Sequence, residues 1–557
     1  MIYIEEKKTN KLPGITSLFV TFDYRPDLVD IVKNQSSAIY DKETKVWEIP
    51  LTSLSSFLDA ACVVDDINIK LLSEESNKSK VYTLSNYKTK PFPYQAEGIQ
   101  FGLNHDSWLL LDAPGLGKTL QLCLLAQELK EREGLEHCLI ICGINTLKTN
   151  WKREIHKHTD LSCKILGERI TRRGNSVIGS VKDRLAELQK PIEEFFVITN
   201  IETLREDSIV KAINKGANKF DMIVVDEVHT CKSPTSQQGK HLLKLTKAKK
   251  RIAATGTMLM NNPLDAYVPL KWIGAEKSNY TNFKYFYCTY GGQFNNILLG
   301  FKNLKVLKDQ IERYSLRRTK DLLDLPEKTI IDEIVDMSDS QQLFYDNIKQ
   351  GIIDQVDKVH MSTTCLLSMV SRLRQATACP SILTSEPIQS SKIQRACDLA
   401  EQIMQSGSKV VIFSTFKETV YEISKQLAQY NPLISTGNEP DSVIDSNIQK
   451  FQNDANYKLF IGTWQKCGTG ITLNAASYMI FIDTPWTQAM YLQAQDRIHR
   501  IGTKQAVTIY NLIAKGTIDE RVHELVQDKA ALSDYIIDDK ITQKSLESLR
   551  KYIEELQ

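Results

Sequence analysis

A lysine and a threonine that close a glycine-containing loop are the first residues whose types and spacing suggest chemistry. Residues 112–119 read Asp-Ala-Pro-Gly-Leu-Gly-Lys-Thr and follow an apolar run at 108–111. Backbone N–H groups and the dipole of a following helix can bind phosphate oxygens at such a loop. Lys118 would neutralise the β and γ phosphates of a nucleotide, and the Thr119 hydroxyl would bind Mg²⁺. The first glycine of the usual pattern is absent, so a plain strand–turn–helix with a solvated lysine stays open as the alternative.

Two acidic residues, Asp226 and Glu227, follow another apolar run at 222–225. Asp226 would hold Mg²⁺, and Glu227 would orient or deprotonate an attacking water. An acidic pair after a strand is often only a helix cap, but open parallel sheets bind ligands at this end of their strands. With the phosphate loop in the same sheet, the pair predicts a site for ATP and Mg²⁺.

Two arginines stand three residues apart in the segment 493–502, far beyond the acidic pair. We expect Arg497 and Arg500 to share one face of a helix and to point at a γ-phosphate held by another domain. There they would stabilise the charge that develops in phosphoryl transfer; a solvated basic face is the alternative. This spread of motifs predicts an ATP site shared by two domains, with hydrolysis coupled to their relative motion. Gln95, ahead of the loop, would contact the adenine edge unless it is an ordinary surface glutamine.

The bulk composition limits the class of protein. A chain of 557 residues with 42% hydrophobic and 25% charged residues predicts three or four globular domains. The formal charge of +2 predicts that any DNA contact comes from a local basic channel. The eleven cysteines form no Cys-x-x-Cys pair, which favours reduced thiols over disulfides or zinc. With no signal peptide or apolar run of about 18 residues, we expect a cytoplasmic protein without a membrane contact.

The elements that must position these residues follow from the pattern of apolar runs. Alternating strands and helices predict an α/β fold with two parallel-sheet domains in tandem. A small α+β unit precedes them, with strands expected at 18–22 and 46–50 and a helix at 26–33. The predicted divisions are an N-terminal domain at 1–72, a linker at 73–85, a first α/β domain at 86–262, a helical insertion and bridge at 263–380, a second α/β domain at 381–518 and a helical tail at 519–557.

The ordered motifs resemble those of superfamily-two helicase-like ATPases, and within them the Swi/Snf-type DNA translocases. Three segments favour that branch over DEAD-box or RecQ-like enzymes: Leu-Arg-Arg-Thr-Lys at 316–320 with Leu-Pro-Glu-Lys at 325–328, Leu-Arg-Gln-Ala at 373–376 before Cys-Pro, and the run at 493–502. The likeness covers about residues 85–530. It implies two RecA-like domains that close over ATP. Departures from the family pattern are Ala113-Pro114, Ile144 and Met258, and none of them removes a catalytic group.

The resemblance also implies where nucleotide and DNA bind. The nucleotide set lies in and around the loop and comprises Gln95, Asp112, Gly115, Leu116, Gly117, Lys118, Thr119 and, in a segment that links DNA to nucleotide, Gly470 and Asn474. The DNA set lines a groove across both domains and comprises Thr146, Trp151, Thr199, Asn200, Ser414, Thr415, Thr463 and Gly468. Hydroxyls, amides and glycines suit sequence-independent phosphate contacts. Read singly, each is equally an ordinary turn or cap residue.

The N-terminal unit resembles the HARP module of annealing helicases, through Phe22, Tyr24, Tyr40 and Trp47. In those proteins the module engages forked DNA; aromatics that only fill a small core are the alternative. The whole pattern predicts a monomeric, ATP-dependent translocase on duplex or forked DNA that remodels or reanneals branches, in a bacterial cell or phage-infected host. A replication, repair or transcription protein is the expected partner class. A true strand-separating helicase and an ATP-switched DNA-binding subunit of a defence, restriction or transcription complex are the alternatives.

Overall fold

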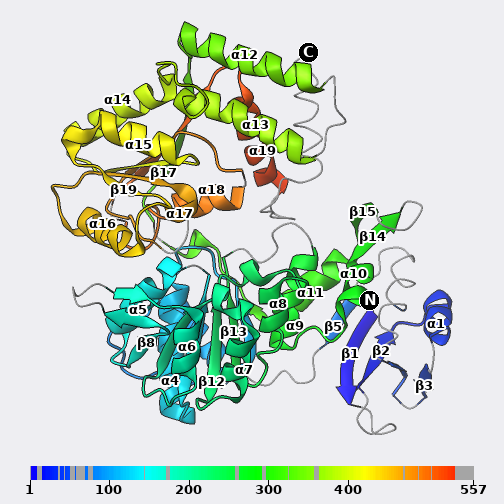
Figure 1. The fold of residues 1–557 in the computed structure, drawn as a ribbon. Helices are drawn as coiled ribbons and strands as arrows, with labels where there is room; N and C mark the ends of the chain where they lie inside the picture. Colours follow the sequence, from blue (N-terminus) through cyan, green and yellow to red (C-terminus); the bar gives the residue numbers. More distant parts are fainter. Residues whose placement is uncertain are drawn as a thin grey trace.

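The computed structural model describes most of the chain, and the statements that follow refer to that part. The described residues are 2–8, 16–35, 38–42, 44–50, 57, 69–72, 80–143, 145–170, 176–256, 263–291, 297–323, 325–356, 363–467, 471–486, 488–503 and 505–532. They form two large domains, one above the other in Figure 1, and a smaller N-terminal unit beside the first of them.

The first large domain is built on a seven-stranded sheet whose neighbouring strands are all parallel. Its order is β16-β6-β13-β12-β7-β11-β8. The strands are β6 (Ser107–Leu110), β7 (His137–Cys142), β8 (Cys163–Ile165), β11 (Phe196–Asn200), β12 (Phe220–Asp226), β13 (Lys250–Ala254) and β16 (Ser315–Leu316). They are nearly continuous apolar runs, because a parallel sheet is covered on both faces.

Alternate residues of these strands enter two separate hydrophobic clusters, as expected from the period of two in a strand. Trp108 and Leu110 pack with one set of helices, whereas Leu109 packs with the other. The helices of the first set are α3 (Pro93–Asn104), α4 (Lys118–Glu133) and α5 (Asn145–His158). The opposite face is covered by α7 (Asp207–Lys215), α8 (Gln237–Leu242) and α9 (Tyr267–Ile273). Helix α6 (Val181–Leu188) packs on this same face and contacts α7.

The second large domain is built on a six-stranded sheet, again with parallel neighbours, in the order β17-β22-β21-β18-β20-β19. Its strands are β17 (Lys328–Val335), β18 (Val410–Ser414), β19 (Leu433–Ser435), β20 (Leu459–Thr463), β21 (Tyr478–Phe481) and β22 (Val507–Ala514). The covering helices are α14 (Ser391–Gln405), α15 (Lys417–Gln426), α16 (Asp441–Asn453), α17 (Trp464–Cys467) and α18 (Gln488–Gln495). The two sheets confirm the predicted fold class.

The stretch expected to be a helical bridge also supplies strands to both sheets. Strand β16 pairs with β6 in the first domain, and β17 pairs with β22 along eight residues in the second. The helices α12 (Asp339–Val356), α13 (Thr363–Ala378) and α19 (Ile518–Leu532) pack together around a separate small core. The sequence pattern did not indicate these strands, because each is short or isolated from βα alternation and is fixed only by its distant partner.

The N-terminal unit is a five-stranded sheet in the order β3-β4-β2-β1-β5 with one helix, α1 (Pro26–Lys33). The strands are β1 (Ile2–Lys8), β2 (Thr16–Phe22), β3 (Ile39–Asp41), β4 (Val46–Pro50) and β5 (Ile69–Leu72). The predicted helix and the strands at 18–22 and 46–50 are present, whereas β1, β3 and β5 were not expected. The buried side chains of this unit, such as Val20 and Val32, belong to the same hydrophobic cluster as Leu307 and Ile311 of the first domain.

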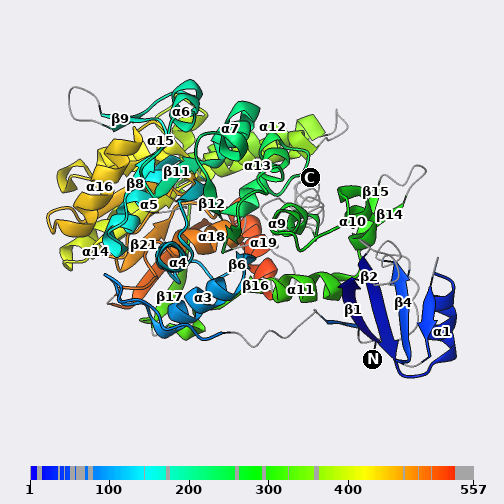
Figure 2. The ribbon, with the colours of Figure 1, turned by 90° about the horizontal axis from the view of Figure 1, so that it is seen from below.

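A helix and a hairpin project from the first domain next to the N-terminal unit. They are α10 (Tyr280–Tyr287), β14 (Cys288–Gly291) and β15 (Ile297–Phe301), and α11 (Leu304–Arg313) leads back to the sheet. Both views place the hairpin on the side of the molecule where the N-terminal sheet lies (Figures 1 and 2), and α11 contacts β5. Among the described residues, no helix has the combined length and apolarity that a membrane crossing requires.

Candidate active site

The phosphate loop connects β6 to α4 and has a backbone that glycine must supply. Gly115 and Gly117 have φ angles of 88° and 74°, in the left-handed region that other residues rarely adopt. A Cβ atom on Gly117 would lie 2.5 Å from Nε2 of Gln95, so a larger residue there would also collide with a neighbour. The helix α4 begins at Lys118, which places its free N–H groups at the loop, as the sequence predicted.

Gln95 holds the loop from the first turn of α3. It is 2% exposed, its Nε2 donates to the Leu116 carbonyl at 3.1 Å, and its Oε1 accepts from the Phe92 N–H at 3.0 Å. The Tyr94 hydroxyl donates to the same Leu116 carbonyl at 3.1 Å. Gln95 is therefore a buried support of the loop and not a surface glutamine, while its contact with adenine stays a prediction.

Lys118 lies inside the site, with its Nζ donating to the Asp112 carbonyl oxygen at 2.9 Å. Burial lowers its pKa, although the charges of Glu227, Asp226 and Asp112 oppose that shift. A partly buried ammonium close to carboxylates gains from an additional anion, because part of its hydration is already lost. This position suits a phosphate ligand.

The side chain of Asp112 points beneath the loop to Arg318, a residue of the Leu-Arg-Arg-Thr-Lys segment. Arg318 Nε and Nη2 donate to the two carboxylate oxygens at 2.9 and 2.6 Å, and Nη2 also donates to Gln121 Oε1 at 2.6 Å. Asp112 is fully buried. The sequence placed Asp112 among the nucleotide ligands and gave Arg318 no role. The pairing spans 206 residues, so only the family motif hinted at it.

The acidic pair lies at the carboxyl end of β12, as predicted. Asp226 Oδ2 accepts from the Trp151 indole N–H at 2.9 Å, and Asp226 Oδ1 accepts from the Glu227 N–H at 3.0 Å. Glu227 has φ 54° and ψ 48°, a left-handed conformation that costs a non-glycine residue free energy. That conformation turns its carboxylate toward the loop side of the sheet, where its charge acts on Lys118.

The pKa values of the two carboxyl groups are shifted in opposite directions. Burial raises the pKa of Asp226, and the neighbouring Glu227 charge adds to the effect. Burial also acts to raise the pKa of Glu227, but the hydrogen bond with His229 and the charges of His229, Lys118 and Arg497 outweigh it and lower this pKa. Glu227 is therefore the more firmly ionised of the pair, as a group that orients a water must be.

His229 and Thr255 complete this cluster, and the sequence assigned neither of them a role. His229 Nδ1 lies 2.9 Å from Thr255 Oγ1 and 3.3 Å from Glu227 Oε2. Thr255 Oγ1 donates to Glu227 Oε2 at 3.4 Å. Thr255 follows β13, the neighbour of β12. Glu227, His229 and Thr255 are thus one hydrogen-bonded unit, which only the adjacency of β12 and β13 reveals.

The two predicted finger arginines lie at the domain interface, but not on a helix. Helix α18 ends at Gln495, and the following turns carry Arg497 and Arg500, so the helical expectation was wrong. The chain leaves the helix because the Arg497 carbonyl accepts from Leu473 N–H at 2.9 Å, a tertiary contact outside the segment. The sequence could not indicate that contact.

Both arginines still lie beside the first domain's site, although their guanidinium groups donate to residues of the second domain. Arg500 Nη1 donates to Thr472 Oγ1 at 2.8 Å, and Arg497 Nη1 donates to the Ile471 carbonyl at 3.2 Å. A Cβ atom on Gly115 would lie only 3.3 Å from the Cβ of Arg500. Burial, together with the Arg500 charge, lowers the pKa of Arg497 to about 10, and Glu227 opposes this shift. The second domain therefore places cationic side chains against the phosphate loop of the first.

Polar contacts join the two domains around this site. Lys320 pairs with Asp496 and donates to the His499 carbonyl at 3.1 Å, while Arg153 of α5 pairs with Asp445 of α16. Between α5 and α16 lies a pocket of about 200 Å³. These contacts hold the two domains together across the interface.

The donor set fits ATP with Mg²⁺. Lys118 and the α4 N-terminus suit phosphate oxygens, and Thr119 with Asp226 would supply the protein ligands of the metal. In the described part of the chain, no three His, Cys, Asp or Glu side chains gather into a metal cluster. Mg²⁺ is usually held by one or two carboxylates together with substrate phosphates and water, and Asp226 would be such a carboxylate.

The residues predicted to contact DNA are mostly buried beside the interface. Trp151, Thr199, Asn200, Ser414 and Thr463 are all less than a tenth exposed. Trp151 supports Asp226, and the Thr199 hydroxyl donates to Thr203 Oγ1 at 3.0 Å. In this structure they support the loops that carry them, and their DNA contacts stay predictions. The side chain of Thr146, together with Gly468 and Gly470, lies outside the described residues.

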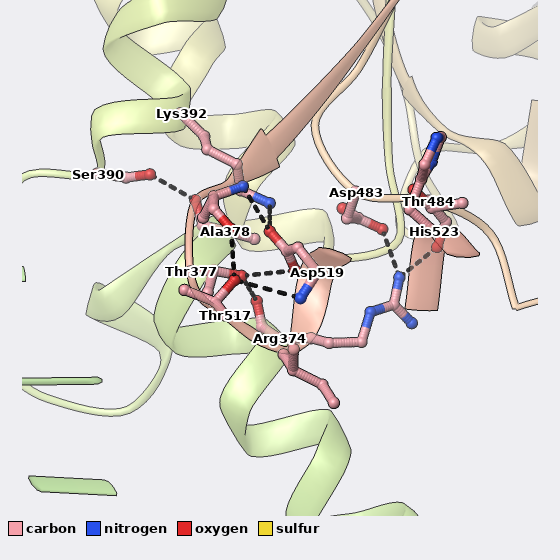
Figure 3. A network of polar contacts seen from close by, with 12 residues as sticks. Arg374, Thr377, Ala378, Ser390, Lys392, Asp483, Thr484, Thr517, Asp519 and His523 are labelled. Atoms are coloured by element: carbon pink, nitrogen blue, oxygen red, sulfur yellow. Dashed lines mark hydrogen bonds and ion pairs between the residues drawn. The ribbon is translucent and has the colours of Figure 1, made fainter. Parts of the chain in front are cut away.

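A buried polar network in the second domain includes Arg374, Asp483 and Asp519 (Figure 3), and Ser414 and Thr415 contact its Asp483. The Ser414 hydroxyl and the Thr415 N–H donate to Asp483 at 2.6 and 3.0 Å. Behind Asp483, Arg374 Nη2 donates to the Thr484 carbonyl at 2.5 Å and lies 3.3 Å from the Asp483 carboxylate.

In the same network, Lys392 and Asp519 form a buried ion pair at 2.5 Å, and Thr377 donates to Asp519 at 3.0 Å. Helices α13, α14 and α19 are thereby tied together behind the predicted DNA segments. Arg374 of the Leu-Arg-Gln-Ala motif thus supports Asp483 and Thr484. At the level of sequence, that motif served only to identify the family.

Comparison with known proteins gives two adjoining family matches. Residues 71–382 match the SNF2-related domain, and residues 391–502 match the helicase conserved C-terminal domain. An uncharacterized ATP-dependent helicase of Mycoplasma pneumoniae is 27% identical over 86% of this chain and 45% of its own length. The ISWI chromatin-remodeling complex ATPase ISW1 of Saccharomyces cerevisiae is 26% identical over 82% of this chain and 41% of its own.

Two further matches are the DNA annealing helicase and endonuclease ZRANB3 of Bos taurus and a solved SWI2/SNF2 ATPase core. The first is 24% identical over 84% of this chain and 42% of its own length. The second, from Sulfolobus solfataricus in complex with dsDNA, is 25% identical, covers 86% of this chain and 98% of that one, and has a TM-score of 0.38. The chain spans about half the length of the first curated relatives it matches.

Proposed function

This chain belongs to the SNF2-related family, and we propose that it is an ATP-dependent translocase on double-stranded DNA that remodels or reanneals branched DNA. The observation that carries the proposal is the position of Arg500 and Arg497 of the second domain against the phosphate loop of the first. Catalytic groups on both domains make hydrolysis depend on domain closure, and closure that recurs with each ATP can move one domain along a bound strand.

Each group has a distinct part in the reaction. Bound ATP with Mg²⁺ supplies the phosphoanhydride bond that is hydrolysed. Lys118 and the α4 N-terminus hold the phosphates, and Thr119 and Asp226 orient the metal. Glu227, kept ionised and fixed by His229 and Thr255, orients the attacking water. Arg497 and Arg500 stabilise the charge on the transferring phosphoryl group when the domains close.

We assign DNA to the segments that carry Thr146, Thr199 and Asn200 in the first domain and Ser414, Thr415 and Thr463 in the second. The support is their position at the ends of parallel strands and their links to the ATP site. Trp151, for example, which lies in the same helix as Thr146, donates its indole N–H to Asp226 at 2.9 Å. Short polar groups of this kind suit phosphate contacts without base readout, so binding is sequence-independent.

We further assign the protein to the cytoplasm as a monomer that cooperates with a replication, repair or transcription protein. For the N-terminal unit, the proposed role is engagement of forked DNA. Its support is Tyr24, 84% exposed, and Tyr40, 43% exposed, which are available for stacking on unpaired bases.

The test is steady-state ATPase activity on single-stranded, duplex and forked DNA of matched length, together with strand-displacement, annealing and triplex-displacement assays. We expect duplex and forks to stimulate hydrolysis more than single strands, and Lys118→Ala and Glu227→Gln to lower the rate by about 10² or more. Lys240→Ala and Glu206→Gln change exposed residues of the same types in the first domain and serve as controls.

The same data separate the alternatives. Displacement of a plain duplex strand by the wild-type protein would favour a strand-separating helicase. Stimulated ATPase activity without displacement of a triplex strand would favour an ATP-switched binding subunit. Wild-type turnover in Glu227→Gln would remove that residue from the mechanism.

A further inference from the structure

The segment that runs through α10 and the β14–β15 hairpin into the first turns of α11 carries an unusual charge. From Lys277 to Lys308 the sequence contains five lysines and no aspartate, glutamate or arginine, although the whole chain has a formal charge of only +2. Lys277, Lys305 and Lys308 are exposed, and Lys284 and Lys302 are partly exposed. A local excess of positive charge on a nearly neutral protein attracts a polyanion to that place.

The same segment exposes large apolar side chains. Tyr285 is 54% exposed and Leu299 is 66% exposed. Tyr285 contacts Tyr290 edge to face, with ring centroids 6.0 Å apart, and Lys284 Nζ lies 4.4 Å above the Tyr290 ring. Aromatic rings next to lysines are the combination with which proteins bind single-stranded nucleic acid, by stacking and by charge.

A β-bulge sets the orientation of Leu299. Thr289 pairs with Gly300 and Tyr290 pairs with Leu298, so Leu299 is the extra residue of β15. A Cβ atom on Gly291 would lie 2.5 Å from the Leu299 Cδ1, which shows that the leucine lies over the glycine of the opposite strand. Bulges of this kind re-aim side chains at functional edges. Exposed leucines of DNA-bending proteins act as wedges between base steps.

The base of the hairpin is rigid. Phe283, Phe286, Tyr287 and Cys288 are each less than a tenth exposed and anchor the segment in the first domain. The Asn303 side chain donates to the Phe286 carbonyl at 2.9 Å, and the Lys302 N–H donates to the Tyr287 carbonyl at the same distance. A fixed platform binds at a lower entropic cost than a mobile one.

We propose that the surface formed by Tyr285, Tyr290 and Leu299, with Lys284 beside it and the other lysines of the segment nearby in sequence, binds unpaired nucleotides at a DNA branch point. Lys308 also lies 3.9 Å from Glu312 on α11. Tyr285 is the stacking surface, and Leu299 is the wedge that lies against the last base pair. The proposal rests on the proposed function, because it assumes a motor on DNA. The surface lies on the same side as the N-terminal unit (Figure 2), whose exposed tyrosines would meet the same branch. An acidic or apolar protein partner is the rival occupant.

The test uses the double variant Tyr285→Ala/Leu299→Ser in the full chain. Its control is Leu343→Ser, because Leu343 is 64% exposed on α12 of the other domain; Tyr285→Phe keeps the ring. Affinities for a fork with unpaired arms and for a plain duplex are measured by fluorescence anisotropy. We expect the double variant to bind the fork about tenfold more weakly and the duplex within about twofold of wild type, since one base–aromatic stack is worth roughly a factor of ten or more. Both control variants keep the wild-type ratio.

A second measurement tests the charge. Replacing Lys277, Lys305 and Lys308 by glutamine should lower the slope of log affinity against log salt for single-stranded arms by about 2, if each contacts one phosphate. Equal losses for fork and duplex, or an unchanged ratio in the double variant, would overturn the proposal and leave a protein partner as the occupant. If the wild-type protein shows no DNA-stimulated ATPase activity, the proposed function fails instead; a stimulated wild type with an unchanged ratio rejects only the hairpin site.

Discussion

Replacing Arg318 by alanine would remove the counter-charge from a carboxylate that has no access to water. Asp112 is fully buried, and Arg318 supplies both of its charged hydrogen bonds, at 2.9 and 2.6 Å. Leaving one member of a buried ion pair without its partner costs about 3–5 kcal/mol. For a domain of this size, 1 kcal/mol corresponds to roughly 2–4 °C, so the melting temperature of the first domain should fall by about 10 °C.

The perturbation should also reach the nucleotide. The Asp112 carbonyl accepts from Lys118 at 2.9 Å, and the Arg318 carbonyl accepts from the Ala113 N–H at 2.9 Å. The segment that contains Arg318 therefore runs beside the phosphate loop. Loss of the Arg318 side chain should weaken ATP binding and also lower the stability of the domain. Arg318→Lys keeps the charge but not the two-pronged geometry, and should fall between wild type and alanine.

The assay is thermal unfolding followed by calorimetry, with and without ATP and Mg²⁺. A double variant, Asp112→Asn/Arg318→Met, removes both charges and should recover most of the lost stability, because no unpaired charge is left buried. A fall of less than about 2 °C in Arg318→Ala, or a double variant as unstable as the single one, would refute this reasoning.

Four further outcomes are expected. Arg497→Ala and Arg500→Ala should cut ATP turnover by about 10² or more while nucleotide affinity largely survives, because the residues that bind the phosphates lie in the other domain. A loss of nucleotide affinity of that size without a loss of turnover, in a kinetic titration, would contradict the role of these arginines in phosphoryl transfer. Duplex affinity should fall steeply between about 50 and 200 mM salt and be indifferent to sequence, as footprinting can check. Lys148 is 1% exposed, and burial, with Arg184 nearby, lowers its pKa from 10.5 to about 8. The folded state therefore binds fewer protons than the unfolded state above about pH 8, so its free energy of unfolding should rise with pH. Relative to Lys148→Met, the rise in wild type between pH 7 and 9.5 should be about 2 kcal/mol, which urea titration can measure. Tyr24→Ala should lower the ratio of fork to duplex affinity without changing the melting temperature, since Tyr24 is 84% exposed; an unchanged ratio would exclude this residue as a junction contact.

Local patterns predicted most of the elements in the two large domains. The apolar runs at 108–111 and 222–225 predicted strands that the structure contains as β6 and β12, because a parallel sheet buries such runs on both faces. The loop before Lys118 was also expected, since its glycines and the helix that follows are adjacent in sequence. Such signals need no knowledge of distant residues.

Tertiary contacts decided the elements that the patterns missed. Strand β17 has a largely exposed face that carries Ile330, Asp332 and Ile334, and it is a strand because β22 pairs with it along its whole length. Arg497 and Arg500 share the spacing of one helical face, yet the chain turns there to satisfy Leu473. In both places a distant backbone partner outweighs the local preference.

The sequence by itself determined the chemistry of this protein: the types of residue that can hold phosphate, metal and water, and their order along the chain. Only the tertiary structure decided which of them support one another. It placed Arg318 under Asp112, Trp151 behind Asp226, and Thr255 beside Glu227. The physical reason is that these groups meet through sheet order and domain docking, and a buried hydrogen bond depends on position in space, whatever the separation along the chain.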